Sequence, residues 1–133
     1  MNKELRNKVL LIAKRVRAWT EAKAVRAKYN PHNLCGWCAI SAAHLFRELS
    51  KSDIKAELHY VPGHCFVSVD DYVVDVTATQ FKVFENKEVV IIHIKEAEQY
   101  WYYSRSVIFD NPTMLRDHQL RQNWPKREIA YTR

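Results

Sequence analysis

Three side chains suited to nucleophilic catalysis lie between residues 34 and 81: the thiol of Cys38, the imidazole of His64 and the carboxylate of Asp75. A cysteine attacks a carbonyl carbon as its thiolate, a neighbouring histidine can take and return the proton, and a carboxylate can hold the imidazole in place. We therefore predict that Cys38 is a nucleophile, that His64 is its base and that Asp75 orients the histidine.

Cys38 opens a helix that we predict over residues 38–50. Apolar residues cover more than one face of this segment, so the helix is expected to be buried. A thiol in the first turn lies at the positive end of the helix dipole, which lowers its pKa, and the free N–H groups there can stabilise an oxyanion. Considered alone, Cys38 fits a buried structural cysteine better.

His64 and Asp75 belong to a predicted hairpin over residues 64–77. A loop of two or four residues would pair Val69 with Tyr72. Because side chains alternate between the faces of a strand, this register places His64 and Asp75 on one face as diagonal neighbours within hydrogen-bonding reach. A three-residue loop would separate them. The pair could also be purely structural, since a buried carboxylate needs a partner whatever its function.

Three short motifs resemble those of the transglutaminase-like and papain-like cysteine enzymes: Gly36-Trp37-Cys38 at a helix start, His64 followed by an aromatic residue at 66, and Val74-Asp75-Val76-Thr77. The resemblance covers residues 34–81. It implies the nucleophile role for Cys38, the base role for His64 and the orienting role for Asp75. It also implies a core in which the cysteine helix packs on an antiparallel sheet.

The glutamine that donates to the oxyanion in papain relatives has no counterpart before Cys38. We assign this role to Asn33, whose side-chain amide can donate in the same way. Four aromatic residues are candidates for substrate binding: Trp37, Tyr100, Trp101 and Tyr103.

The other segments predict an α+β fold with a single domain, residues 1–133. A long amphipathic helix is expected over residues 3–29, with its basic residues, Arg17 among them, on the faces away from the core. A final helix should open at Asn111-Pro112, because Asn is a good cap and Pro suits the first helical position. Residues 97–110 are ambiguous between strand and helix. An antiparallel sheet of about four strands is expected from residues 55–61, 64–69, 72–77 and 88–94.

Composition limits the kinds of partner and the cellular compartment that we expect for this protein. Lys and Arg outnumber Asp and Glu by 21 to 15, which makes the formal net charge +6 and favours a partner with an acidic surface. No apolar run is long enough to span a bilayer, so we expect no membrane partner. Three cysteines do not suggest a disulfide framework. We therefore expect a cytoplasmic protein with reduced thiols.

These features predict cysteine-dependent acyl transfer on the amide bonds of a protein or peptide, with no metal or other cofactor. A hydrolase (peptidase, isopeptidase or protein glutamine deamidase) is favoured over a transglutaminase-type crosslinking enzyme, because no feature excludes water. The alternatives are a basic nucleic-acid-binding module and a redox or zinc site at Cys35 and Cys38. Zinc is disfavoured, since the further ligands His64 and Cys65 would point to opposite faces of a strand.

Overall fold

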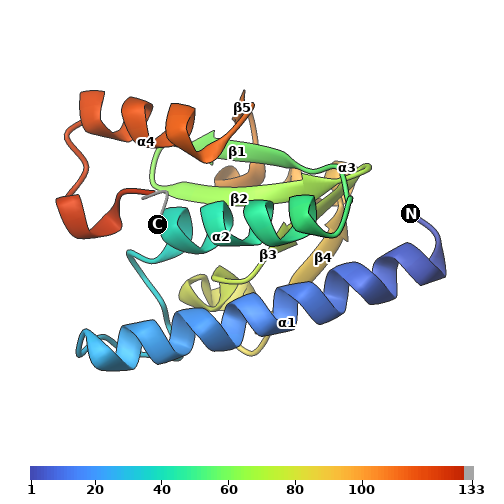
Figure 1. The fold of residues 1–133 in the computed structure, drawn as a ribbon, viewed down its shortest axis with the longest axis horizontal. Coiled ribbons are helices and arrows are strands. Elements are labelled where there is room, and N and C mark those ends of the chain that lie inside the picture. Colours follow the sequence, from blue (N-terminus) through green and yellow to red (C-terminus); the bar gives the residue numbers. More distant parts are fainter. Residues whose placement is uncertain (131–133) are drawn as a thin grey trace.

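The computed structural model of the chain describes residues 1–130 and has an α+β fold (Figure 1). The helices are α1 (Lys3–Arg26), α2 (Cys38–Lys51), α3 (Ile94–Ala97) and α4 (Pro112–Arg121). The strands are β1 (Glu57–Val61), β2 (His64–Val69), β3 (Tyr72–Asp75), β4 (Val90–His93) and β5 (Val107–Phe109). Short 3-10 helical turns cover residues 78–80, 82–84, 101–103 and 126–128.

The strands form one antiparallel sheet in the order β4-β3-β2-β1-β5. The sheet has five strands, so the expectation of about four is corrected. The additional strand comes from the ambiguous residues 97–110. This segment divides into a 3-10 turn at residues 101–103 and the strand β5, which pairs with β1 at the edge of the sheet.

Helices α1 and α2 pack side by side on one face of the sheet (Figure 1). Cys65, Val67 and Val74 belong to the core on this face, whereas Phe66 and Val73 belong to a second core. The second core is completed by aromatic residues from the segment 81–103. Both faces of the sheet are therefore covered, which explains why every residue of β2 is buried.

The long helix α1 ends at Arg26, slightly before the predicted end. The reason is a C-terminal cap in which Lys28 adopts a left-handed conformation and the Tyr29 N–H bonds to the Ala24 carbonyl. Within residues 1–130, neither this helix nor any other is long and apolar enough to cross a membrane.

The register of the hairpin formed by β2 and β3 is the predicted one. Val69 pairs with Tyr72 and Val67 with Val74, so the loop contains only residues 70 and 71. The preceding turn joins β1 to β2 through Pro62 and Gly63, and Gly63 has a φ of +94°, which a side chain rarely tolerates. This turn positions His64 at the first residue of β2.

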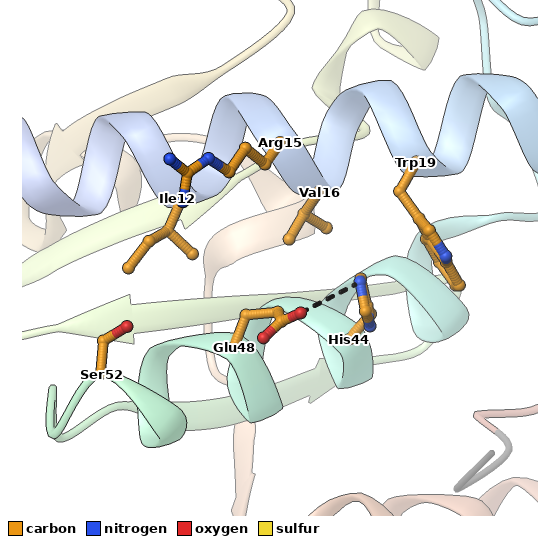
Figure 2. A pocket seen from close by; sticks show the side chains of 7 residues that line it. All are labelled: Ile12, Arg15, Val16, Trp19, His44, Glu48 and Ser52. Carbon is orange, nitrogen blue, oxygen red and sulfur yellow. Dashed lines mark ion pairs between the residues drawn. The ribbon is translucent and has the colours of Figure 1, made fainter.

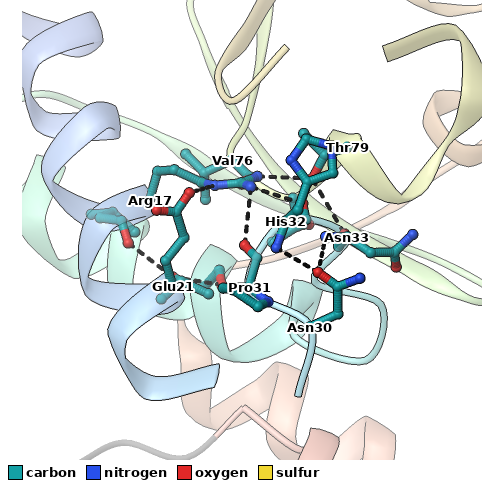
Figure 3. Close-up of polar contacts among 12 residues, drawn as sticks. Arg17, Glu21, Asn30, Pro31, His32, Asn33, Val76 and Thr79 are labelled. Atoms are coloured by element: carbon teal, nitrogen blue, oxygen red, sulfur yellow. Dashed lines mark hydrogen bonds and ion pairs between the residues drawn. The ribbon is translucent and has the colours of Figure 1, made fainter. Parts of the chain in front are cut away.

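Arg17 is buried in the described fold, although its place on the basic side of α1 predicted exposure. Its guanidinium donates to the Val76 carbonyl at 3.0 Å and to the His32 carbonyl at 2.9 Å (Figure 3). It also bonds to Thr79 and pairs with Glu21. Arg17 therefore ties α1 to the loop before Cys38 and to the loop after Asp75.

Replacing Arg17 with Met should lower the free energy of unfolding by roughly 3 kcal/mol or more, because several buried carbonyl groups lose a charged donor. Urea denaturation measures this loss. The matched control is Arg15→Met on the exposed side of the same helix, for which we expect a change within about 0.5 kcal/mol. Equal effects of the two substitutions would contradict the tethering role of Arg17.

Candidate active site

Cys38 is the first residue of α2 and lies at the wall of a cavity of about 350 Å³. Trp37 occupies the N-cap position but makes no side-chain capping bond, so the N-cap side chain does not occupy the N–H groups of the first turn. Gly36 has a φ of +88°, and its Cα lies against the Glu128 side chain. This tight loop turns the chain into α2 so that the thiol lines the cavity.

His64 and Asp75 form a buried pair. The distance between His64 Nε2 and Asp75 Oδ2 is 2.7 Å, and both side chains are almost inaccessible to solvent. The carboxylate has further donors: the Tyr103 hydroxyl lies 2.7 Å from Oδ2, and the Thr77 N–H lies 2.9 Å from Oδ1. With these donors, Asp75 can remain ionised inside the protein and can hold the imidazole in one orientation.

The thiol of Cys38 interacts with the imidazole of His64 by a hydrogen bond and by charge. Burial opposes a charge on His64, but Asp75 and Cys38 together raise the pKa of His64 to about 10. The pKa of Cys38 is well below its ordinary value, because a hydrogen bond from Cys65 and the contact with His64 outweigh its burial. The lowered pKa of the thiol and the raised pKa of the imidazole together favour a proton on His64 and a negative charge on the Cys38 sulfur.

A second buried histidine, His59, shows how strongly the raised pKa of His64 depends on the carboxylate of Asp75. His59 bonds to the hydroxyls of Ser68 and Ser106 and has no carboxylate partner among these contacts. Burial lowers the pKa of His59 to about 4. The imidazole of His59, which bonds to two hydroxyl groups, is thus neutral at pH 7. The imidazole of His64, which bonds to a carboxylate, is protonated.

The cavity beside Cys38 is lined mainly by the loop before α2 and by residues 122–128 near the C-terminus. Its lining residues are Cys35, Gly36, Cys38, Gly63, Gln80, Gln122, Asn123, Trp124, Pro125 and Glu128. Gln80 is the notable polar member, because its amide nitrogen donates to the Thr77 carbonyl and approaches His64 Nδ1 to 3.5 Å. No motif in the sequence indicated this position for Gln80, which only the structure places at the cavity.

Asn33 and Trp37 lie outside this lining. The Asn33 side-chain oxygen accepts a bond from the Cys35 N–H, so it shapes the loop. Trp37 is buried against Tyr29 and Leu34. Neither residue is placed where it would contact a molecule in the cavity.

The three aromatic candidates in the segment 100–103 take different positions. Tyr103 is buried and bonds to Asp75, so it supports the site from behind. Trp101 is exposed and its ring lies over Gly63, at the edge of the cavity. Tyr100 packs against Phe84 in the second core. Of the three, only Trp101 is near the cavity opening.

A second cavity of about 280 Å³ lies between α1 and α2 (Figure 2). Trp19 stacks on His44, which faces Glu48 at 3.8 Å. Its lining contains no cysteine, and burial lowers the pKa of His44. This cavity therefore lacks a counterpart of Cys38, the thiol that lines the first cavity.

Within residues 1–130, no group of three or more His, Cys, Asp or Glu side chains is arranged to hold a metal ion. Cys35 is exposed, whereas Cys38 and Cys65 are buried.

We expect iodoacetamide to alkylate Cys38 at pH 7 nearly as fast as at pH 8.5, because the thiolate is lost only as the pH falls through the lowered pKa. An ordinary thiol has only a few per cent thiolate at pH 7. Asp75→Asn removes the charge that keeps His64 protonated, so the pKa of Cys38 should rise and the rate at pH 7 should fall about tenfold or more.

Mass spectrometry of the digested protein measures each cysteine separately, and the exposed Cys35 is the internal reference. Cys38 should react faster than Cys35 at pH 7 despite its burial. A slower reaction of Cys38, or an unchanged rate in Asp75→Asn, would contradict the thiolate–imidazolium pair.

The chain matches no family model, no curated protein and no solved structure. The resemblance to transglutaminase-like and papain-like enzymes therefore stays a hypothesis based on the residues themselves.

Proposed function

We propose that the chain is a cysteine-dependent acyl-transfer enzyme that acts on amide bonds, with hydrolysis as the preferred outcome. One observation carries the proposal: Cys38, His64 and Asp75 are in contact in that order, and the thiol lines an open cavity. A buried structural cysteine needs neither a charged imidazole beside it nor a cavity in front of it.

In the proposed first step, the Cys38 thiolate attacks the carbonyl carbon of an amide in the cavity. The carbonyl oxygen becomes an oxyanion, for which the N–H groups of the first turn of α2 are suitable donors. We favour Gln80 over Asn33 as a side-chain donor, because Gln80 lines the cavity and Asn33 does not.

In the proposed second step, His64 gives its proton to the amine or ammonia that leaves, and Cys38 keeps the acyl group as a thioester. The neutral imidazole then takes a proton from water, and the hydroxide attacks the thioester. The products are a carboxylic acid and the restored thiolate beside protonated His64. Asp75 and Tyr103 keep the ring aligned through both steps.

The family and fold resemblance belongs to this proposal. A helix that begins at the nucleophile packs on an antiparallel sheet, whose strands β2 and β3 supply His64 and Asp75. This arrangement supports a core like that of the transglutaminase-like and papain-like enzymes. The net charge of +6 favours a protein or peptide substrate with an acidic surface, and reduced thiols suit the cytoplasm.

The test uses p-nitrophenyl acetate as an acyl donor that any competent thiol enzyme can accept. The expected result is a burst of one p-nitrophenolate per chain, with acetyl on Cys38 by mass spectrometry, followed by slower turnover. Cys38→Ala should abolish the burst, and His64→Gln should slow it by about a hundredfold or more. Turnover that a primary amine accelerates would indicate transfer to amines instead of hydrolysis.

The matched control is Cys35→Ser, which removes the exposed thiol of the same cavity and should leave the burst intact. Circular dichroism checks that each variant is folded. A burst that survives in Cys38→Ala, or acetyl found on Cys35 alone, would refute the proposed nucleophile.

A further inference from the structure

Cys65 is in direct contact with the proposed nucleophile, and the proposed mechanism does not use it. Both cysteines belong to the same buried core cluster, and each thiol shifts the pKa of the other. The contact joins the start of α2 to the second residue of β2, two elements that pack closely. It is therefore part of the buried core and not a chance meeting of two surface side chains.

The two thiols differ in access. Cys38 lines the cavity of about 350 Å³, so a small solute can reach its sulfur. Cys65 is 1% exposed and is not among the residues that line this cavity. A reagent that enters the cavity therefore meets Cys38 first, and Cys65 reacts only through Cys38.

The two thiols also differ in charge. The pKa of Cys38 is lowered, whereas burial and the neighbouring Cys38 raise the pKa of Cys65 well above its ordinary value. Peroxides attack thiolates, so oxidation begins at Cys38 and leaves Cys65 as an intact thiol beside it.

The sequence alone favours a different partner, because Cys35-Gly36-Trp37-Cys38 has the spacing of a dithiol motif. In the structure Cys35 is exposed, and its N–H is held by Asn33 in the loop before α2. The Cys38 sulfur makes its thiol contact with Cys65.

From this contact we propose that Cys38 and Cys65 form a site of reversible oxidation, in which a peroxide converts the two thiols into a disulfide. The bond blocks the nucleophile while it lasts, and a dithiol reductant restores it. This inference needs only the thiol contact and a reactive Cys38, so it does not depend on which acyl substrate the enzyme takes.

The reaction balances in two steps. The Cys38 thiolate attacks one oxygen of hydrogen peroxide, the O–O bond breaks, and the leaving hydroxide takes a proton from His64 to become water. The Cys65 sulfur then attacks the sulfenic sulfur, and the sulfenic oxygen leaves as a second water with the Cys65 proton. The two cysteines lose two electrons and the peroxide gains two.

The disulfide also protects the nucleophile. A sulfenic acid that finds no thiol is oxidised further to sulfinic acid, which reductants such as dithiothreitol do not reverse. Because Cys65 is already in contact, the disulfide should form before a second peroxide arrives.

The experiment treats the reduced full-length chain with hydrogen peroxide, blocks the remaining thiols with iodoacetamide and digests with trypsin. Cys35 and Cys38 lie in one tryptic peptide, residues 29–47, and Cys65 lies in another, residues 56–82. We expect these two peptides to be joined through Cys38 and Cys65, with Cys35 alkylated. Dithiothreitol should separate them and restore the labelling of Cys38.

Two different substitutions of Cys65, the proposed disulfide partner of Cys38, keep the test independent of folding effects. In Cys65→Ala and Cys65→Ser, the cross-link should be lost and Cys38 should accumulate sulfinic acid. Cys65→Ser keeps a hydroxyl donor near the Cys38 sulfur, so rapid alkylation of Cys38 before peroxide treatment shows that this variant retains the site. In Cys65→Ala the alkylation of Cys38 should slow, because the donor that lowers its pKa is gone. Cys35→Ser is the matched control and should form the cross-link as the unchanged chain does.

A bond within the peptide 29–47, or sulfinic acid on Cys38 beside an alkylated Cys65, would overturn the inference. If either result accompanied a normal burst with p-nitrophenyl acetate, the oxidation proposal would be wrong and the acyl-transfer proposal would still hold. Loss of the burst together with slow alkylation of Cys38 would instead refute the proposed function.

Discussion

The burial of a carboxylate at Asp75 is the constraint on which the site depends. An isolated carboxylate inside a protein is unstable, so donors must surround it. Here the donors are the His64 imidazole, the Tyr103 hydroxyl and the Thr77 N–H, which come from three separate segments. The same charge keeps His64 protonated and thereby favours the thiolate of Cys38. One buried negative charge thus organises both the packing and the reactivity of the site.

Arg17 is a buried positive charge that contacts the loop before Cys38 and the loop after Asp75. It donates to the carbonyl groups of Pro31, His32 and Val76 and to the Thr79 hydroxyl, in the segments that lead into Cys38 and away from Asp75. Such loops need donors for their buried carbonyls because they lack the ladder bonds of a sheet. Within the described residues, every buried side-chain nitrogen and oxygen has a partner. The buried polar side chains around Cys38, His64 and Asp75 are therefore held by partners within the protein itself.

The arrangement of the cysteines connects the proposed chemistry with the proposed oxidation. A thiolate that is reactive toward a carbonyl carbon is also reactive toward a peroxide. Burying a second thiol against it stabilises the thiolate by a hydrogen bond and offers a partner for a disulfide. Both properties depend on the alternation of side chains along β2. Because of this alternation, His64 and Cys65 lie toward different faces of the sheet, close to the start of α2.

Local interactions explain what could be predicted from the sequence alone. The start of α2 at Cys38, the Asn111 cap of α4 and the register of the β2–β3 hairpin depend on neighbours within a few residues, and all three were predicted correctly. The pairing of His64 with Asp75 follows from that register. The tertiary structure alone decided the burial of Arg17, the bond from Tyr103 to Asp75, the place of Gln80 at the cavity and the contact of Cys38 with Cys65. Each of these joins segments that are distant in the chain, and no local pattern encodes which distant partner a side chain will meet.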